Sequence, residues 1–278
     1  MAARLEDWIG RTETAHDLVT EGLIERYVAT LGRALAGREP PATLGLHWCL
    51  APPAVPLSDT GPDGHPARGG FLPPVPLPRR MWAGGALIVH DMLQAGDLVE
   101  RHSRIADVRM KEGRSGRLCF VTVEHRHVGP RGLVIEERQD IVYREAPAGP
   151  QPLSGAPASP DRPGDIAVEI EATPPLLFRY SALTFNGHRI HYDRVYAIEV
   201  EHYPGLVVHG PLQATLALRL AAAAGSGQRL RRFTYRGVSP LIAGETFRVR
   251  ARRETDDTMV LSVVAADGRE TMTGQAEW

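Results

Sequence analysis

The side chains best suited to chemistry stand in one stretch of the C-terminal half. Six polar residues share the eight positions from 186 to 193, namely Asn186, His188, Arg189, His191, Tyr192 and Asp193. Further along, the run Val-Val-His-Gly-Pro at 207–211 leads into a long apolar segment. A histidine side chain takes up and releases a proton near neutral pH, so His191 is a candidate acid/base group.

The apolar segment is predicted to be a helix over 211–224, with Pro211 in its first turn and Gly225 just past its end. The first turn of a helix presents unpaired backbone N–H groups and a partial positive charge. Gly210 has no Cβ, so a ligand can approach its backbone closely. A thioester carbonyl placed there would be polarised and its enolate held, which makes Gly210 a candidate oxyanion site.

The pattern FNGHRIHYD followed by GLVVHGPL resembles the MaoC-like, type 2 3-hydroxyacyl-thioester dehydratase family, which has a double hotdog fold. The segments DWIGR at 7–11 and GGFLPPVPLPRRMWAGG at 69–85 are similar to the subgroup with bacterial itaconyl- and mesaconyl-CoA hydratases. The resemblance implies a hydro-lyase that reversibly hydrates an enoyl-CoA thioester. It favours a branched C4–C5 dicarboxylyl-CoA, such as mesaconyl- or itaconyl-CoA with citramalyl-CoA as the hydrated form.

The resemblance also implies roles for individual residues. His191 falls on the family's catalytic histidine, and Gly210 on the glycine whose N–H binds the thioester carbonyl. His188 and Arg189 fall on an Asn-Pro pair. Asn186 falls on an aspartate, and because an amide cannot act as a base, His191 must carry more of the proton transfer. Asn186 would then orient water or the imidazole.

Seven side chains are candidates for helping His191 or binding substrate. Asp193 or Tyr192 could assist His191, and Tyr180 and His188 are expected to contact substrate. His209 either contacts substrate or satisfies backbone groups at the helix entry. Arg179 and Arg189 are either solvated charges or a bidentate site for a substrate carboxylate.

Metal binding and other function classes are less well supported. The histidines at 188, 191, 202 and 209 lack the helical context of a zinc motif, so no metal is expected, and no redox cofactor is implied. A fatty-acid-type 3-hydroxyacyl-CoA or acyl-carrier-protein dehydratase is the nearest alternative. A hotdog acyl-CoA thioesterase and an acyl-CoA-binding sensor remain alternatives. A thioesterase needs a carboxylate aimed at the carbonyl, so the amide of Asn186 argues against it.

Composition limits partners and location. The formal net charge of −1 argues against nucleic acid or an anionic membrane as the main partner. The N-terminus has no apolar signal core, and no apolar run reaches the length of a membrane span, so we expect a soluble, cytoplasmic protein. The substrate would be a CoA thioester, and the resemblance implies a homo-oligomer, a dimer or higher.

The chain divides at residues 146–164, a segment with six prolines that is typical of a linker. The expected units are an N-terminal hotdog over 1–145, which shapes the acyl and CoA pocket without catalysing, and a C-terminal hotdog over 165–278. The first unit should open with a helix that Thr14 and Asp17 cap. A proline-rich loop over 51–78, functional or mobile, should precede an antiparallel meander of strands at 86–93, 98–110, 117–128 and 133–145.

The second unit repeats this order. We expect a strand at 165–171, a helical or turn segment at 176–184, a polar loop at 185–194, the helix at 211–224, and strands at 229–238, 245–254, 258–266 and 270–278. Asp267-Gly268 should form a two-residue hairpin turn. The predicted fold class is therefore α+β, with two antiparallel sheets that each wrap around a central helix.

Overall fold

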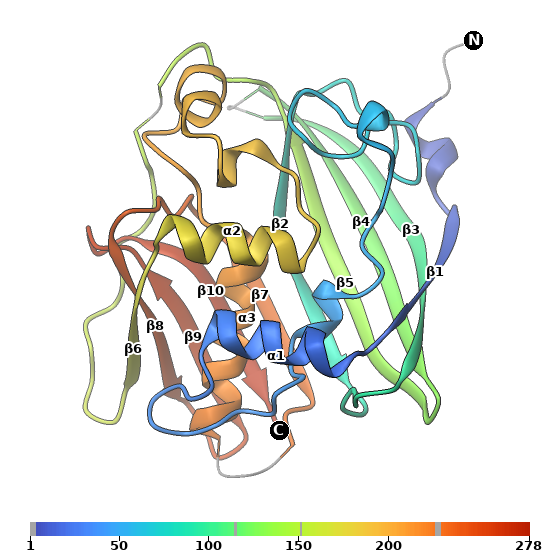
Figure 1. Cartoon of the computed structure of the whole chain (residues 1–278). Helices are drawn as coiled ribbons and strands as arrows, with labels where there is room; N and C mark the ends of the chain where they lie inside the picture. The colour runs from blue at the N-terminus through green and yellow to red at the C-terminus, as the bar shows by residue number, and fades with distance from the viewer. Residues whose placement is uncertain (1–3, 114–115, 151, 226–228) are drawn as a thin grey trace.

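The computed structural model describes residues 4–278 apart from 114–115, 151 and 226–228. Its described strands form one antiparallel sheet in the order β1-β3-β4-β5-β2-β7-β10-β9-β8-β6 (Figure 1). In chain order, the strands are β1 (Thr12–Leu18), β2 (Arg79–Val89), β3 (Leu98–Gly113), β4 (Gly116–Gly129), β5 (Gly132–Arg144), β6 (Ile166–Glu171), β7 (Arg232–Gly237), β8 (Thr246–Arg253), β9 (Thr258–Val264) and β10 (Glu270–Glu277).

The helices lie against or beside this sheet. In the described residues the α-helices are α1 (Glu21–Leu31), α2 (Pro174–Leu183) and α3 (Gly210–Ala224). Short 3-10 helices cover Leu5–Trp8, Leu46–Cys49, Leu57–Asp59 and Arg189–His191, and a π-helix covers Tyr196–Val200. In the part of the chain that the structure describes, no helix has the length and apolar character needed to cross a membrane.

The two halves share one sheet because β2 pairs with β7. This junction requires close approach of the two backbones. A Cβ on Gly85 would lie 2.2 Å from the Arg138 carbonyl oxygen and 2.3 Å from the Tyr235 hydroxyl, so only glycine fits there. The α+β hotdog class is confirmed, but the expectation of two separate sheets is wrong, since edge strands from each half complete each other's hydrogen bonds.

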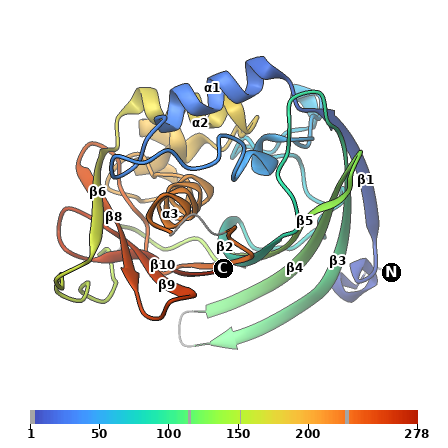
Figure 2. The ribbon, with the colours of Figure 1, turned by 90° about the horizontal axis from the view of Figure 1, so that it is seen from below.

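Helix α3 is the central helix of the C-terminal half. It packs against β8, β9 and β10, which curl around it (Figure 2). Twelve of its fifteen residues are buried, as its nearly uniform apolar sequence predicts. The predicted helix over 211–224 is therefore confirmed with a start one residue earlier, at Gly210.

The N-terminal half is built differently. Its helix α1 packs against α2 rather than lying in the curve of β3, β4 and β5, as Figure 2 shows. The expectation of a central helix in each half is therefore wrong for this half. The concave side of its strands is left to line a cavity, described below.

The start of α1 also differs from the prediction. Thr14 and Asp17 lie in β1, which pairs with β3, instead of capping a helix. The N-cap is Thr20, whose hydroxyl accepts a hydrogen bond from the Leu23 amide at 3.1 Å. Asp17 instead accepts the backbone N–H of Ala51. An alternating segment that can complete a sheet edge prefers the strand, whatever weak capping signal it carries.

The predicted strands are confirmed with small shifts at their ends, and β2 begins seven residues before the predicted start at 86. The last hairpin is longer than expected. The Ala265 amide donates to the Arg269 carbonyl, which encloses the three residues 266–268, and Gly268 takes the left-handed conformation with φ +84°. Residues 146–164 contain no described helix or strand, and their role as a boundary between two units stays a prediction.

Candidate active site

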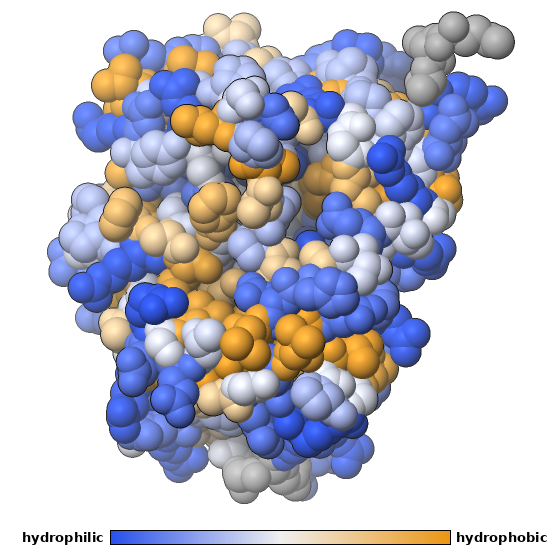
Figure 3. Space-filling model, turned by 45° about the vertical axis from the view of Figure 1, so that its right-hand side comes forward, coloured by the Kyte–Doolittle hydropathy of each residue, from blue (hydrophilic) through white to orange (hydrophobic). Residues whose placement is uncertain are grey.

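A cavity of about 1650 Å³ lies between the two halves. Its walls come from β2, from the proline-rich loop 51–78, from the polar loop after α2, and from the first turn of α3. Apolar residues are gathered across the middle of the face drawn in Figure 3, whereas hydrophilic residues cover most of the rest. Both His191 and Gly210 line this one cavity, as the sequence argument requires.

His191 is buried and held in one orientation. It ends the short helix Arg189–His191, and its Nδ1 lies 2.7 Å from the Val207 carbonyl oxygen. Because a carbonyl can only accept, Nδ1 carries the proton and Nε2 has a free lone pair. Burial lowers the pKa of His191 to about 3, although the Val207 bond opposes this shift. The imidazole is therefore neutral near pH 7 and can accept a proton at Nε2.

Gly210 is the first residue of α3, preceded by His209 as N-cap. Within the described residues, no hydrogen bond from its amide is recorded, as expected for the first turn of a helix. A Cβ on Gly210 would lie 3.0 Å from Cε3 of Trp82, which also lines the cavity. The space at Gly210 is therefore tight, and a side chain at this position would press on Trp82.

Asn186 and His188 lie beside His191 in the same wall. Phe185 turns the chain with φ +49°, and the Asn186 amide donates back to Ser181 in α2. The Asn186 side-chain oxygen accepts the His188 amide at 2.9 Å. The His188 ring meets the His191 ring edge-on at 5.3 Å, and burial keeps the pKa of His188 far below its ordinary value. Asn186 therefore shapes the loop that carries both histidines.

Three other predicted residues surround His191. Tyr180 is buried and hydrogen-bonded to Thr215 on α3, and Tyr192 donates to the Gly187 carbonyl; both tyrosines line the cavity. His209 does not line it. Its ring stacks on His191 at 3.6 Å, and its Nε2 is bonded to the Ser181 hydroxyl. His209 thus supports the His191 ring from behind rather than contacting substrate.

The structure does not support the predicted carboxylate-binding role of Arg179 or Arg189. Arg179 is exposed on α2, and neither arginine is among the cavity-lining residues. Arg189 donates to Asp193 at 2.8 Å and 3.0 Å and to the Pro62 carbonyl at 3.0 Å. Asp193 is occupied by Arg189 and by the Tyr196 amide, so it does not help His191. Arg189 and Asp193 instead anchor the proline-rich loop.

The proline-rich loop brings two residues that the sequence argument missed. Asp63 and His65 pack against the polar loop, where a Cβ on Gly64 would lie 1.9 Å from the Gly187 carbonyl oxygen. The Arg189 amide donates to the Asp63 carbonyl at 2.9 Å. Loop 51–78 was predicted to be functional or mobile, but its Asp-Gly-His sequence carried no signal that it would fold over a segment more than 120 residues away.

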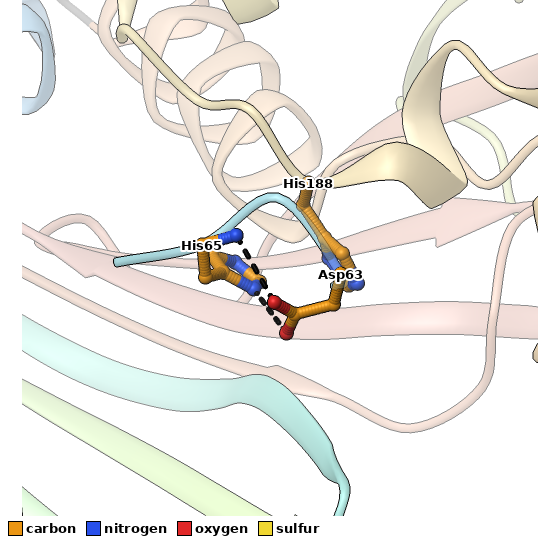
Figure 4. A group of neighbouring side chains, drawn as sticks. All are labelled: Asp63, His65 and His188. Carbon is orange, nitrogen blue, oxygen red and sulfur yellow. Dashed lines mark hydrogen bonds and ion pairs between the residues drawn. The ribbon is translucent and has the colours of Figure 1, made fainter. Parts of the chain in front are cut away.

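Figure 4 shows Asp63, His65 and His188 converging from these two loops. The His65 Nδ1 lies 2.9 Å from Asp63 Oδ2, and the His65 ring lies 4.1 Å from the His188 ring. One ligating atom from each residue lies within 4.8 Å of the others, so this group differs from the histidine set considered from the sequence and could hold a metal ion. We name His65, His188, His191 and His209 the His191 cluster.

A second group of histidines lies in the N-terminal half. Here the buried Glu137 accepts hydrogen bonds from Trp48 and Gln139 at 2.7 Å and 2.8 Å. Its other oxygen lies 4.0 Å and 3.9 Å from the Nε2 atoms of His47 and His127. We name His47, His125, His127 and Glu137 the Glu137 cluster; of these four, only His125 lines the cavity.

Comparisons with known proteins identify the family. Residues 45–243 match the family model for hydroxyacyl-thioester dehydratase type 2. The chain is 42% identical to mesaconyl-C(4)-CoA hydratase of Chloroflexus aurantiacus, over 97% of this chain and 96% of that protein. It is 30% identical to the mitochondrial hydroxyacyl-thioester dehydratase type 2 of Schizosaccharomyces pombe, over 74% of this chain and 76% of that protein.

Solved structures show the same fold at low sequence identity. A MaoC-like dehydratase superimposes with a TM-score of 0.72 at 17% identity, covering 99% of both chains. A Mycobacterium tuberculosis protein described as having a double hotdog fold superimposes with a TM-score of 0.57 at 13% identity, over 97% of this chain and 96% of that one. The chain therefore belongs to the MaoC-like, hydroxyacyl-thioester dehydratase type 2 family and has a double hotdog fold.

Proposed function

We propose that the protein reversibly hydrates the C2=C3 double bond of an enoyl-CoA thioester. The observation that carries this proposal is that His191, whose Nδ1 is bonded to Val207 so that Nε2 can accept, and Gly210 line one cavity. The thioester carbonyl rests on the Gly210 amide, where the α3 dipole favours the enolate. His191 accepts the O–H of the attacking water or of the 3-hydroxyl group, and Asn186 holds the loop in place.

The substrate we propose is a branched C4–C5 dicarboxylyl-CoA of the mesaconyl type, which the 42% identical relative supports. Such a substrate needs a cation for its free carboxylate. Arg80 lines the cavity, and among the described residues no acidic side chain lies within ion-pair distance of it. Its neighbour Arg79 is already paired with Glu201 at 2.7 Å. Arg80 is therefore the side chain we assign to the substrate carboxylate.

A spectrophotometric assay tests the reaction. Purified protein is mixed with mesaconyl-CoA, crotonyl-CoA or a longer enoyl-CoA, and enoyl absorbance and free thiol are followed together. Loss of absorbance without thiol is expected. Thiol release would indicate a thioesterase, and binding without turnover would indicate a sensor; either result overturns the proposal. A preference for longer enoyl chains would favour the fatty-acid-type dehydratase.

The Arg80→Gln variant tests the substrate class. We expect its kcat/KM for mesaconyl-CoA to fall by about 100-fold, because a bidentate charge-assisted pair is lost, and its kcat/KM for crotonyl-CoA to stay within about threefold. Equal losses for both substrates would contradict the assignment. Association into a homo-oligomer also stays a prediction, which size-exclusion chromatography with light scattering would check.

A further inference from the structure

The surroundings of His191 suit it to accepting a hydrogen bond from water. They stabilise its protonated form, the imidazolium, poorly. Its Nδ1 faces the neutral carbonyl of Val207, and its ring stacks on His209, whose pKa burial holds well below its ordinary value. A carboxylate stabilises an adjacent imidazolium much more than a carbonyl or a neutral ring does. A hydratase nevertheless needs a group that carries the proton between water and C2.

His65 has the partner that His191 lacks. Its Nδ1 lies 2.9 Å from Asp63 Oδ2, and its backbone amide donates to Asp63 Oδ1 at 3.1 Å (Figure 4). Burial alone would raise the pKa of Asp63, but the hydrogen bond and charge of His65 bring it below its ordinary value. The ionised carboxylate fixes the proton on Nδ1, so His65 Nε2 is free to accept, as in catalytic triads.

The position of this pair is fixed from the C-terminal half. The Asp63 carbonyl accepts the Arg189 amide at 2.9 Å, and Arg189 Nη1 donates to Pro62 next to it. The His65 ring packs on His188 at 4.1 Å. Loop 59–66 is thus held against the same segment that carries His191, and His65 lines the same cavity. Such a held side chain keeps its geometry through a reaction.

We propose that His65, oriented by Asp63, is a second acid/base group of the active site, contributed by the N-terminal half. This inference rests on the proposed hydratase function. In hydration, an O–H bond of water breaks and its proton passes to His65 Nε2, while the oxygen bonds to C3. The C2=C3 electrons move to the thioester oxygen, which the Gly210 amide holds. The proton then returns from Nε2 to C2, and the carbonyl re-forms. Throughout, His191 Nε2 accepts a hydrogen bond from the other O–H of the attacking water.

The charges around His65 agree with its starting as a neutral base. Burial, then the positive charges of Arg80 and, more weakly, Arg68, lower its pKa to about 4, while Asp63 opposes them. His65 in turn lowers the pKa of His191, so the two rings do not carry protons together. A dicarboxylyl substrate bound to Arg80 would cancel one of the opposing charges and make His65 a stronger base.

The test uses the full-length protein, mesaconyl-CoA and two variants. General acid–base catalysis contributes about 10²–10⁴-fold, so His65→Ala should lower kcat at least about 100-fold. Free imidazole added to this variant should restore part of the rate, which a merely structural role for His65 would not allow. Asp63→Asn keeps the shape of the side chain but removes its charge, and should lower kcat by about 10- to 100-fold with KM within about threefold.

The matched control is His90→Gln. His90 is also paired with a carboxylate, Glu136 at 2.8 Å, but it does not line the cavity. This variant should keep wild-type kcat. Thermal unfolding of all the variants shows whether each one is folded and so separates loss of chemistry from loss of fold. A rate restored by imidazole is a second check, because it can come only from folded protein.

Three outcomes would overturn the inference. The first is His65→Ala or Asp63→Asn with kcat within about threefold of wild type. The second is a loss in His65→Ala that imidazole does not restore in folded protein. The third is loss of wild-type activity on chelation with recovery on added Zn²⁺, because Asp63, His65 and His188 would then be metal ligands. If wild-type protein hydrates no enoyl-CoA at all, the proposed function fails instead.

Discussion

The His191 cluster and the Glu137 cluster are alike in composition and unlike in what they can do. Both bury several histidines, and burial lowers the pKa of His191 and of His47 alike, to about 3. The Glu137 carboxylate, however, sits at the centre of its cluster and is closed off by Trp48. In the His191 cluster three of the four histidines, His65, His188 and His191, line the cavity, whereas of the Glu137 cluster only His125 does. Burial lowers the pKa of a histidine in each cluster, whereas the two clusters differ in how many of their side chains reach the cavity.

The most direct test of the difference between the two clusters is to replace one histidine in each and compare the effect on turnover. His191→Ala should lower kcat for mesaconyl-CoA hydration by about 1000-fold, because it removes the group that accepts the O–H of water. His47→Ala should leave kcat within about threefold and lower the melting temperature instead. Steady-state kinetics and thermal unfolding of both variants provide the check. Similar losses of kcat in the two would abolish the distinction.

Removal of the Glu137 carboxylate should affect stability rather than turnover. Glu137→Ala removes a buried carboxylate and leaves the half-buried Trp48 and Gln139 donors without their acceptor, which should lower the free energy of unfolding by about 3 kcal/mol. Urea unfolding measures this loss. A variant of wild-type stability with much reduced kcat would instead make the Glu137 cluster part of the active site.

Stability should also depend on pH through both clusters. His47 and His191 have folded pKa values of about 3, against 6.5 for an ordinary histidine, so the unfolded chain binds more protons between these limits. The stability they contribute is complete above pH 6.5 and is lost as the pH falls toward 3. Between pH 6.5 and 5 each should account for about 2 kcal/mol. Urea unfolding at pH 7 and pH 5 would show it, and His47→Gln should flatten the dependence.

The smallest expected effect concerns how the proline-rich loop is held. Arg189→Ala removes the bonds to Pro62 and Asp193, so loop 59–66 should loosen and kcat/KM should fall about three- to fivefold. Arg179 lies outside the cavity, so the Arg179→Ala variant should have the kcat/KM of the wild type in the same assay. A 100-fold loss in Arg189→Ala, selective for dicarboxylyl substrates, would revive the idea that this arginine binds substrate.

Much of the site could be predicted from local sequence, because its parts are local structures. The pairing of His191 with Gly210 followed from one polar segment and one helix start, and both residues border the cavity. The strands and α3 followed from their hydrophobic pattern, since periodicity is a property of neighbouring residues. The assignment of Arg179 and Arg189 to a substrate carboxylate is not supported, because which way a charged side chain turns depends on partners far away in sequence.

The amino-acid sequence by itself determined the family, the α+β class, and the segment that carries His191 and Gly210. Only the tertiary structure decided that the halves share one sheet, that the N-terminal half leaves its concave side open to a cavity, and that Asp63 and His65 meet His188. The physical reason is that helices and strands arise from contacts within a few residues. The pairing of β2 with β7 and the docking of the two loops depend on glycines such as Gly64 and Gly85. These glycines are needed because segments far away in the sequence approach their backbones closely.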